Sequence, residues 1–168
     1  MQIHACHSIM GFVVVLGLTV GGTACESGGT RGDREEETAQ RVTLAEMSAP
    51  ARATAEKLVA GGTVEKIDRE VERGVVVYDV EATVQGKHVE YTIGVDGSVV
   101  GTETSIGLDE LPQAVRVAAL AHFGGDSGLN AARVEEYGQT TYEIEGMKRG
   151  KKVSATFDSM GKMLEEEG

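Results

Sequence analysis

The sequence has few aromatic residues and few cysteines, and each shortage excludes a class of function. Aromatic residues make up 4% of the 168 residues, tryptophan is absent, and the formal net charge is -11. Binding to nucleic acid relies on cations that neutralise phosphates and on rings that stack on bases, so no nucleic-acid partner is expected. The two cysteines are Cys6 and Cys25. After Cys25 the chain therefore has no disulfide and no cysteine metal site, and its core must stabilise it.

Long apolar runs are scarce too, and the clearest one lies near the N-terminus, at residues 9–18. A transmembrane helix needs about 20 apolar residues, so this run is too short to span a membrane. Residues 1–25 contain no Asp, Glu, Lys or Arg, and small residues follow the run, as in a secretory signal peptide. We therefore predict that residues 1–25 are a signal peptide and that the protein is exported to the periplasm or cell envelope.

The end of this leader, Gly-Thr-Ala-Cys at residues 22–25, resembles the bacterial lipobox. That resemblance implies that Cys25 is lipidated and attaches the protein to the membrane. Secretion without an anchor and a retained membrane segment are the alternatives. Residues 26–41 are rich in Ser, Gly and Glu and show no apolar periodicity, which predicts a disordered linker.

The rest of the chain contains one pattern twice, at an offset of 64 positions. Tyr-Asp-Val-Glu at residues 78–81 recurs as Tyr-Glu-Ile-Glu at residues 142–145, and Gly-Lys at 86–87 recurs at 150–151. An internal repeat constrains the architecture more than any single motif does. We therefore predict two repeats, the first at residues 42–104 and the second at residues 105–168.

Each repeat is expected to open with a helix. Thr43 and Glu46 have capping-box spacing, and apolar residues from Leu44 to Leu58 recur at steps of three and four. In the second repeat, Asp109 is the expected cap and Pro112 is expected in the first helical turn, where its missing amide hydrogen costs nothing.

Strands are expected to follow each helix. Apolar and polar residues alternate over residues 76–84 and 88–95, on either side of a Gln85-Gly86 turn. This phase places Tyr78 and its counterpart Tyr142 in the core beneath the helices. The predicted fold is α+β, with two tandem helix-on-antiparallel-sheet repeats and a second sheet face that is polar and exposed.

The order of these motifs resembles that of PepSY and PepSY-like domains of exported bacterial proteins, and the tandem arrangement resembles the β-lactamase-inhibitor-protein fold. The resemblance rests on residues 78–81 with Asp96-Gly97, and on residues 142–145 with Gly161. In the second copy Met160 occupies the position that corresponds to Asp96. The resemblance implies extracellular binding or regulation of a peptidase.

Motifs that suggest catalysis do not have the context that catalysis needs. Ser159 and Lys162 fit Ser-x-x-Lys, but they lie in a predicted hairpin turn and the partner motifs are missing. No nucleophile–base pair and no set of metal ligands can be assembled from the sequence, so neither an enzyme nor a cofactor is expected.

The favoured hypothesis is a binding module for an envelope protein or peptidase. Its predicted contacts are polar residues on the exposed sheet face and a basic hairpin, namely Asp79, Glu81, Glu90, Thr92, Glu143, Glu145 and Thr156, with Lys148, Arg149, Lys151 and Lys152. The basic hairpin also has a simpler interpretation, as a solvated turn. Two alternative functions remain, a Ca²⁺ or ligand sensor that uses Asp79, Glu81 and Glu90, and a structural envelope protein.

Overall fold

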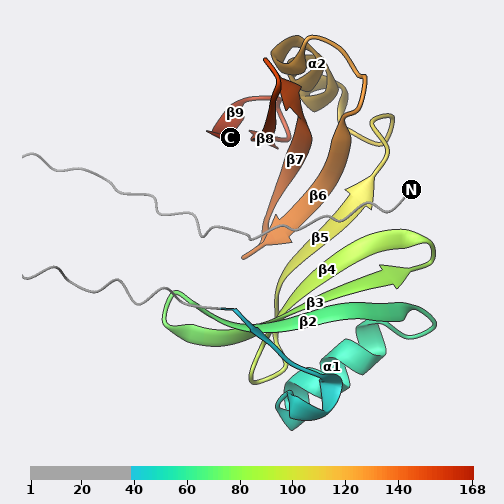
Figure 1. Ribbon diagram of the computed structural model, residues 1–168, viewed down its shortest axis with the longest axis vertical. Helices are drawn as coiled ribbons and strands as arrows, with labels where there is room; N and C mark the ends of the chain where they lie inside the picture. Colours follow the sequence, from blue (N-terminus) through green and yellow to red (C-terminus); the bar gives the residue numbers. More distant parts are fainter. Residues whose placement is uncertain (1–38) are drawn as a thin grey trace, which may run out of the picture.

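The computed structural model describes residues 39–168, which form one nine-stranded antiparallel sheet with two short α-helices (Figure 1). The strands lie in the sheet in chain order. They are β1 (Gln40–Arg41), β2 (Thr63–Glu72), β3 (Val75–Val84), β4 (Lys87–Gly94), β5 (Val99–Ile106), β6 (Asn130–Glu136), β7 (Gln139–Lys148), β8 (Lys151–Asp158) and β9 (Met163–Glu167). The helices are a 3₁₀ turn, η1 (Leu44–Glu46), then α1 (Ala49–Leu58) and α2 (Gln113–Phe123).

The predicted signal peptide, Cys25 and most of the predicted linker lie outside the described residues. Within residues 39–168, neither helix is long and apolar enough to cross a membrane.

The prediction of an α+β fold made of two tandem helix-on-sheet repeats is wrong. The chain forms a single sheet that is mostly β, because β5 and β6 pair from Gly101 with Glu136 to Ile106 with Ala131. The predicted repeat boundary, between residues 104 and 105, falls within β5 and inside this pairing. A separate first sheet would have left the backbone groups of β5 unpaired along an edge, and the β5–β6 hydrogen bonds satisfy them instead.

Tight hairpins connect most neighbouring strands. Gln85 and Gly86 have φ values of 53° and 80°, as a two-residue turn with two left-handed positions requires, so the turn predicted there is confirmed. The same conformation occurs at Arg73–Gly74, Tyr137–Gly138 and Arg149–Gly150. These turns return the chain at once to the neighbouring position in the sheet.

Both helices pack on the same face of the sheet, at opposite ends of the molecule (Figure 1). The α1 cluster includes Ala51, Ala55, Tyr78, Val80 and Ile93. The α2 cluster includes Val115, Ala119, Ile144, Ala155 and Phe157. The predicted strand phase is confirmed for Tyr78, which is buried, whereas Tyr142 is only partly buried beside the α2 cluster.

The helices begin later than predicted. Thr43 and Glu46 interact as the capping box predicts, because the Thr43 amide and hydroxyl both donate to Glu46 Oε2 at 2.8 Å. They cap only the 3₁₀ turn, however, and α1 begins after Ser48, whose hydroxyl accepts a hydrogen bond from the Ala51 amide. In the second half, the N-cap of α2 is Pro112 rather than Asp109.

Gly97 and Gly161 lie in matching turns beneath the two helix starts. Their φ values are 85° and 80°, and a Cβ atom would lie 2.9 Å from the Pro50 carbonyl oxygen and 2.5 Å from that of Ala114, respectively. The repeated glycine is therefore explained by close contact between each turn and the first turn of its helix.

Candidate functional site

The face of the sheet that faces away from the helices, here called the open face, carries many carboxylates. Side chains alternate along each strand, so the observed register places these groups in rows across β2–β6. One row contains Asp68, Asp79, Thr92, Gly101 and Glu136. The next contains Lys66, Glu81, Glu90, Glu103 and Val134.

At one end of these rows, cations neutralise the acids. Lys66 Nζ lies 2.8 Å from both Asp68 Oδ2 and Glu81 Oε1, and Arg41 Nε donates to Asp68 Oδ1 at 2.8 Å. Burial alone would raise the pKa of Asp68, but the hydrogen bonds from Lys66 and Arg41 outweigh burial and lower it. This part of the open face is a satisfied ion-pair network.

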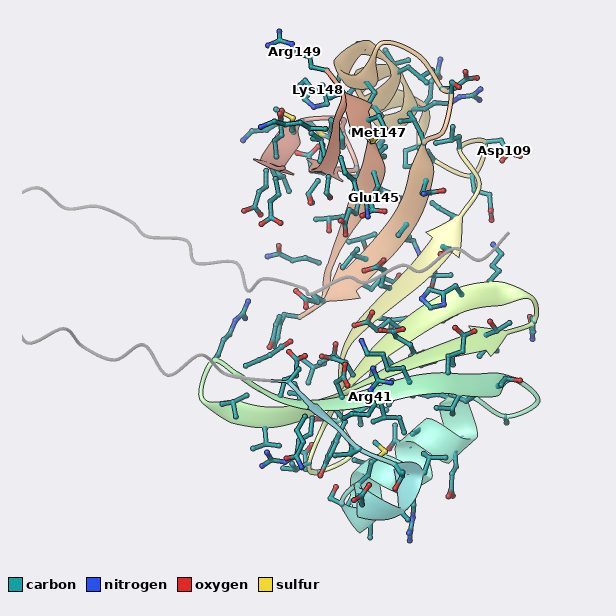
Figure 2. All side chains as sticks on the ribbon, viewed as in Figure 1. Arg41, Asp109, Glu145, Met147, Lys148 and Arg149 are labelled. Atoms are coloured by element: carbon teal, nitrogen blue, oxygen red, sulfur yellow. The ribbon has the colours of Figure 1, made fainter. Side chains whose placement is uncertain are left out.

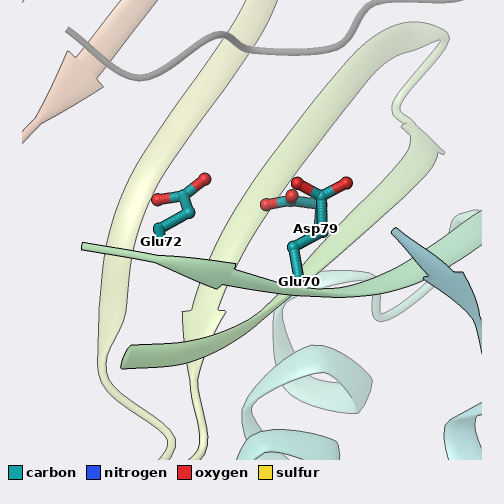
Figure 3. A group of neighbouring side chains, drawn as sticks. All are labelled: Glu70, Glu72 and Asp79. Atoms are coloured by element: carbon teal, nitrogen blue, oxygen red, sulfur yellow. The ribbon is translucent and has the colours of Figure 1, made fainter. Parts of the chain in front are cut away.

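Further along β2, three carboxylates converge (Figure 3). Glu70, Glu72 and Asp79 each offer an oxygen, and these oxygens all lie within 4.8 Å of one another. Asp79 is the most buried of the three and accepts a hydrogen bond from Thr92 Oγ1 at 2.8 Å. Burial raises the pKa of Asp79 to about 7, because the Thr92 hydrogen bond opposes this effect only in part and the charges of Glu72 and Glu70 add to it.

Next to this group, Glu90, Glu103 and Glu136 line a small hollow over β4–β6. Glu90 is only 9% exposed. Burial raises the pKa of Glu90 to about 8, and the charges of Asp79 and Glu103 contribute to the increase. Burial and the charge of Glu136 also raise the pKa of Glu72, so the two groups of acids are electrostatically coupled.

We call this combined site the carboxylate hollow, and it comprises Glu70, Glu72, Asp79, Glu90, Glu103 and Glu136. Thr92 and Gly101 lie at its centre, in the row between Asp79 and Glu136. A Cβ atom on Gly101 would lie 3.0 Å from Glu136 Cγ and 3.5 Å from Thr92 Cβ. The missing side chain at Gly101 therefore leaves the room in which Glu136 lies across the sheet.

Coiling of the sheet explains why acids are buried on a face without a helix. Arg73, at the β2–β3 turn, lies over the ring of Tyr137, at the β6–β7 turn, with its Cζ 4.5 Å from the ring centroid. The two hairpins extend to the same side of the molecule (Figure 1). Strands β4 and β5 lie between these two hairpins in the sheet, and on β4 Glu90 is 9% exposed and Thr92 is 3% exposed. The open face is less exposed than the sequence predicts.

The other predicted contacts on the open face lie in the second half of the sheet. Glu143 accepts a hydrogen bond from Ser154 Oγ at 2.5 Å, and Glu145 forms an ion pair with Lys152 at 3.1 Å. Thr156 is the strand neighbour of Glu143. The structure therefore separates Glu143, Glu145 and Thr156 from the carboxylate hollow, although the sequence predicts one continuous surface.

The predicted basic hairpin is divided between the two faces. Lys148, next to α2 (Figure 2), lies 2.9 Å from Glu166 Oε2 and 3.1 Å from His122 Nε2. Lys152 is held by Glu145 on the open face, while Arg149 and Lys151 are exposed at the turn. Acids from neighbouring strands thus compensate two of the four cations, which sequence inspection of the turn did not reveal.

The sequence prediction missed Glu70, Glu72, Glu103 and Glu136. A signal was available in β2, where Lys66, Asp68, Glu70 and Glu72 alternate and therefore share a face. The predicted Ca²⁺ ligands, Asp79, Glu81 and Glu90, do not form the convergent group. Asp79 meets Glu70 and Glu72 instead, and Glu81 is paired with Lys66.

No protein-family model matches the sequence, and no curated protein matches it. Several solved structures are similar in fold. A candidate periplasmic protein from Bacteroides eggerthii is 21% identical, with a TM-score of 0.58, over 72% of this chain and 88% of that chain. A BLIP-like protein from Bacteroides fragilis is 23% identical, with a TM-score of 0.54, over 72% of this chain and 85% of that chain.

A DUF2874 family protein from Bacteroides ovatus is 18% identical, with a TM-score of 0.55, over 72% of this chain and 86% of that chain. At these identities the similarity shows a shared fold and nothing more. The resemblance to a β-lactamase-inhibitor-protein fold is consistent with this result. The PepSY resemblance stays a prediction.

Proposed function

We propose that the protein is a non-enzymatic binding module of the periplasm or cell envelope, which binds a protein partner through the open face of its sheet. The observation that carries this proposal is the asymmetry of the sheet. Both helices cover one face, and the other face holds the carboxylate hollow. The fold shared with a candidate periplasmic protein supports the location in the periplasm or cell envelope. The fold shared with a BLIP-like protein supports the role in binding another protein.

The charge of the open face defines the chemistry of the partner. Carboxylates in a partly dehydrated hollow attract cationic side chains and repel anionic ones, so the best-matched partner presents Lys or Arg. Such an interface associates quickly at low salt and weakens as salt screens its charges. Arg149 and Lys151, at the far hairpin, stay a predicted second contact.

Neutralising two acids of the hollow, with Glu103→Gln and Glu136→Gln in one variant, is expected to reduce capture of the partner from envelope extract by about tenfold or more. The reason is that these acids supply the attraction while contributing little to the core. Capture by the unchanged protein should also decrease as salt increases. Quantitative mass spectrometry of the captured proteins measures both effects.

The matched control carries Glu56→Gln and Glu135→Gln, which remove the same charge outside the open face. Among residues 39–168 the ion pairs of these side chains are long, with Arg52 to Glu56 at 3.9 Å and Arg133 to Glu135 at 3.8 Å. The control should capture the same proteins as the unchanged protein. If the two double variants lose the partner equally, the open face is not the binding surface.

Lipidation of Cys25 is a separate part of the proposal, based on the lipobox-like residues before it. Stable anchoring needs more than one lipid chain, because a single acyl chain binds membranes reversibly. The Cys25→Ser variant is expected to move from the membrane fraction to the soluble fraction, as measured by fractionation and intact-mass analysis. An unchanged membrane fraction, or an unmodified mass for the original protein, would contradict lipidation.

A further inference from the structure

The outer edge of β9, the last strand of the sheet, pairs with no other strand of residues 39–168. The positions 64 residues before β9 lie in β5, whose outer edge is filled by β6. In β5, Val100 and Thr102 are half-buried, whereas their counterparts in β9, Leu164 and Glu166, are exposed. The same part of the fold therefore binds a strand in the first half of the chain and, among the described residues, lacks one in the second.

Backbone groups along this edge point away from the sheet. In β5 the Val100 carbonyl oxygen accepts a hydrogen bond at 3.3 Å from the Tyr137 amide, just after β6. Leu164 is the counterpart of Val100 in β9. Because backbone groups alternate in direction along a strand, those of Glu166 point the same way as those of Leu164. An extended segment can therefore pair with these two residues as β6 pairs with β5.

The charge of the edge argues against a second copy of this chain as the added strand. The counterpart of β6 in another copy is β2, and the β5–β6 register would place Glu165 opposite Glu72. It would also place Glu167 opposite Glu70. Like charges directly opposite each other destabilise a strand pair, and each corresponding pair within the chain contains only one acid. In addition, β1 occupies part of the β2 edge.

We propose that the outer edge of β9 binds an extended segment of a partner protein by strand addition, and that this segment carries Lys or Arg at two alternate positions. Glu165 and Glu167 both point to the open face, so the alternate side chains of an added strand lie beside them. Opposite charges at these positions stabilise the strand pair. The edge is separate from the carboxylate hollow on β2–β6, so this contact goes beyond the proposed function.

On the helix side of the sheet, the edge favours an apolar residue between the two cations. Lys148 already pairs with Glu166 there, with its Nζ 2.9 Å from Glu166 Oε2. Met163 lies opposite Phe157, a buried residue of the α2 cluster. Met163 and Leu164 are 43% and 42% exposed, and covering apolar surface stabilises a complex. The best-matched segment therefore reads cation, apolar residue, cation.

The probe is the labelled peptide Ala-Ala-Arg-Lys-Val-Lys-Tyr, which is based on residues 131–137 and has Lys at the positions that face Glu165 and Glu167. Fluorescence anisotropy should show saturable binding to the purified protein that weakens as salt increases. The acidic peptide Ala-Ala-Arg-Glu-Val-Glu-Tyr should bind about tenfold more weakly, or less, because two attractive pairs become repulsive. Combining Glu165→Lys with Glu167→Lys should reverse this preference.

The double variant with Glu103→Gln and Glu136→Gln is the matched control, because it removes the same number of acids from the carboxylate hollow. It should bind the cationic peptide as the unchanged protein does. Hydrogen exchange then locates the added strand. The amides of Leu164 and Glu166 should exchange more slowly when the peptide is bound, whereas the amide of Glu165, which points toward β8, should change little.

Several results would overturn strand addition at this edge. They are no saturable binding, equal binding of the two peptides, and loss of binding in the hollow variant. Slow exchange of Leu164 and Glu166 without peptide would also overturn it. If that protection rises with protein concentration, a second copy covers the edge, and if it does not, another segment of this chain does. The two peptides and the exchange measurement use the unchanged protein, so the test holds even if the Lys variant fails to fold.

Discussion

Replacing Tyr78 with alanine is expected to lower the free energy of unfolding by about 3–5 kcal/mol, the usual cost of truncating a large buried aromatic residue. Tyr78 is 5% exposed and lies in the α1 cluster. Its hydroxyl also accepts a hydrogen bond at 3.1 Å from the amide of Ser48, the N-cap of α1. The substitution therefore leaves a cavity and removes a contact that positions the start of the helix. Urea denaturation measures the change.

Two further variants test the separate contributions of the Tyr78 hydroxyl and of burial. Tyr78→Phe keeps the ring and removes the hydroxyl, so it should cost about 1 kcal/mol, the contribution of one hydrogen bond. Tyr142→Ala should cost clearly less than Tyr78→Ala, because Tyr142 is only partly buried. Equal losses for Tyr78→Ala and Tyr142→Ala, or a nearly neutral Tyr78→Ala, would contradict the difference in burial.

The comparison of these two tyrosines shows what the sequence can predict. Alternation in residues 76–84 indicates correctly that Tyr78 faces the core, because side chains in a strand alternate between the two faces. The 64-residue offset then predicts an equivalent role for Tyr142. The sequence cannot reveal that Tyr142 is less covered, since burial depends on how α2 and its neighbours pack over that strand.

The carboxylate hollow shows how much of a candidate site the sequence can predict. Alternation in β2 places Glu70 and Glu72 on the open face, so this part of the site was within reach of the sequence. Their approach to acids of distant strands depends on the coiling of the sheet, which brings Arg73 to Tyr137 and Glu72 close to Glu136. Pattern identifies the face of a residue, whereas coiling determines which residues of that face meet.

The continuous sheet was missed for a similar reason. The repeated motifs predict the helices, the turns at Gln85-Gly86 and Gly97, and the antiparallel order within each half. Hydrogen bonding between β5 and β6 joins backbone groups and does not require a particular side-chain motif. A repeat in the sequence therefore does not show whether the two copies form separate sheets or one.

Raising the pH from about 5.5 to about 8.5 is expected to destabilise the protein, in buffer free of divalent cations. In the unfolded chain Asp79 and Glu90 lose their protons near their ordinary pKa values, 3.8 and 4.5, whereas folding raises these values to about 7 and about 8. Between these limits the folded state holds more protons than the unfolded state. Stability therefore falls as the pH rises through this window and levels off above it.

Acids whose pKa is lowered by folding affect the stability of the protein only at lower pH. Asp68, Glu46, Asp96, Glu110 and Glu166 have this property, because hydrogen bonds stabilise their charged forms. Their contribution to stability is lost only as the pH falls below about 4.5. It therefore makes stability increase with pH, whereas Asp79 and Glu90 make it decrease. The window from about pH 5.5 to 8.5 therefore isolates the groups with raised pKa values from these acids.

The Glu90→Gln variant assigns the effect to one residue. Each pKa unit corresponds to about 1.4 kcal/mol, so the ionisation of Glu90 should account for a few kcal/mol of the loss at high pH. Glutamine has nearly the same shape and no charge, so this variant should be more stable than the unchanged protein at about pH 8.5. Its stability should also depend less on pH in urea denaturation at constant ionic strength.

The Glu143→Gln variant is the matched control, because Glu143 lies on the open face and has a hydrogen-bond partner in Ser154. Its pH profile should run parallel to that of the unchanged protein, so that other groups titrating in the window cancel in the comparison. A parallel profile for Glu90→Gln as well would mean that Glu90 is already ionised and compensated in the folded protein at neutral pH. In that case the loss of stability at high pH would have to come from Asp79 and the other acids of the hollow, and not from Glu90.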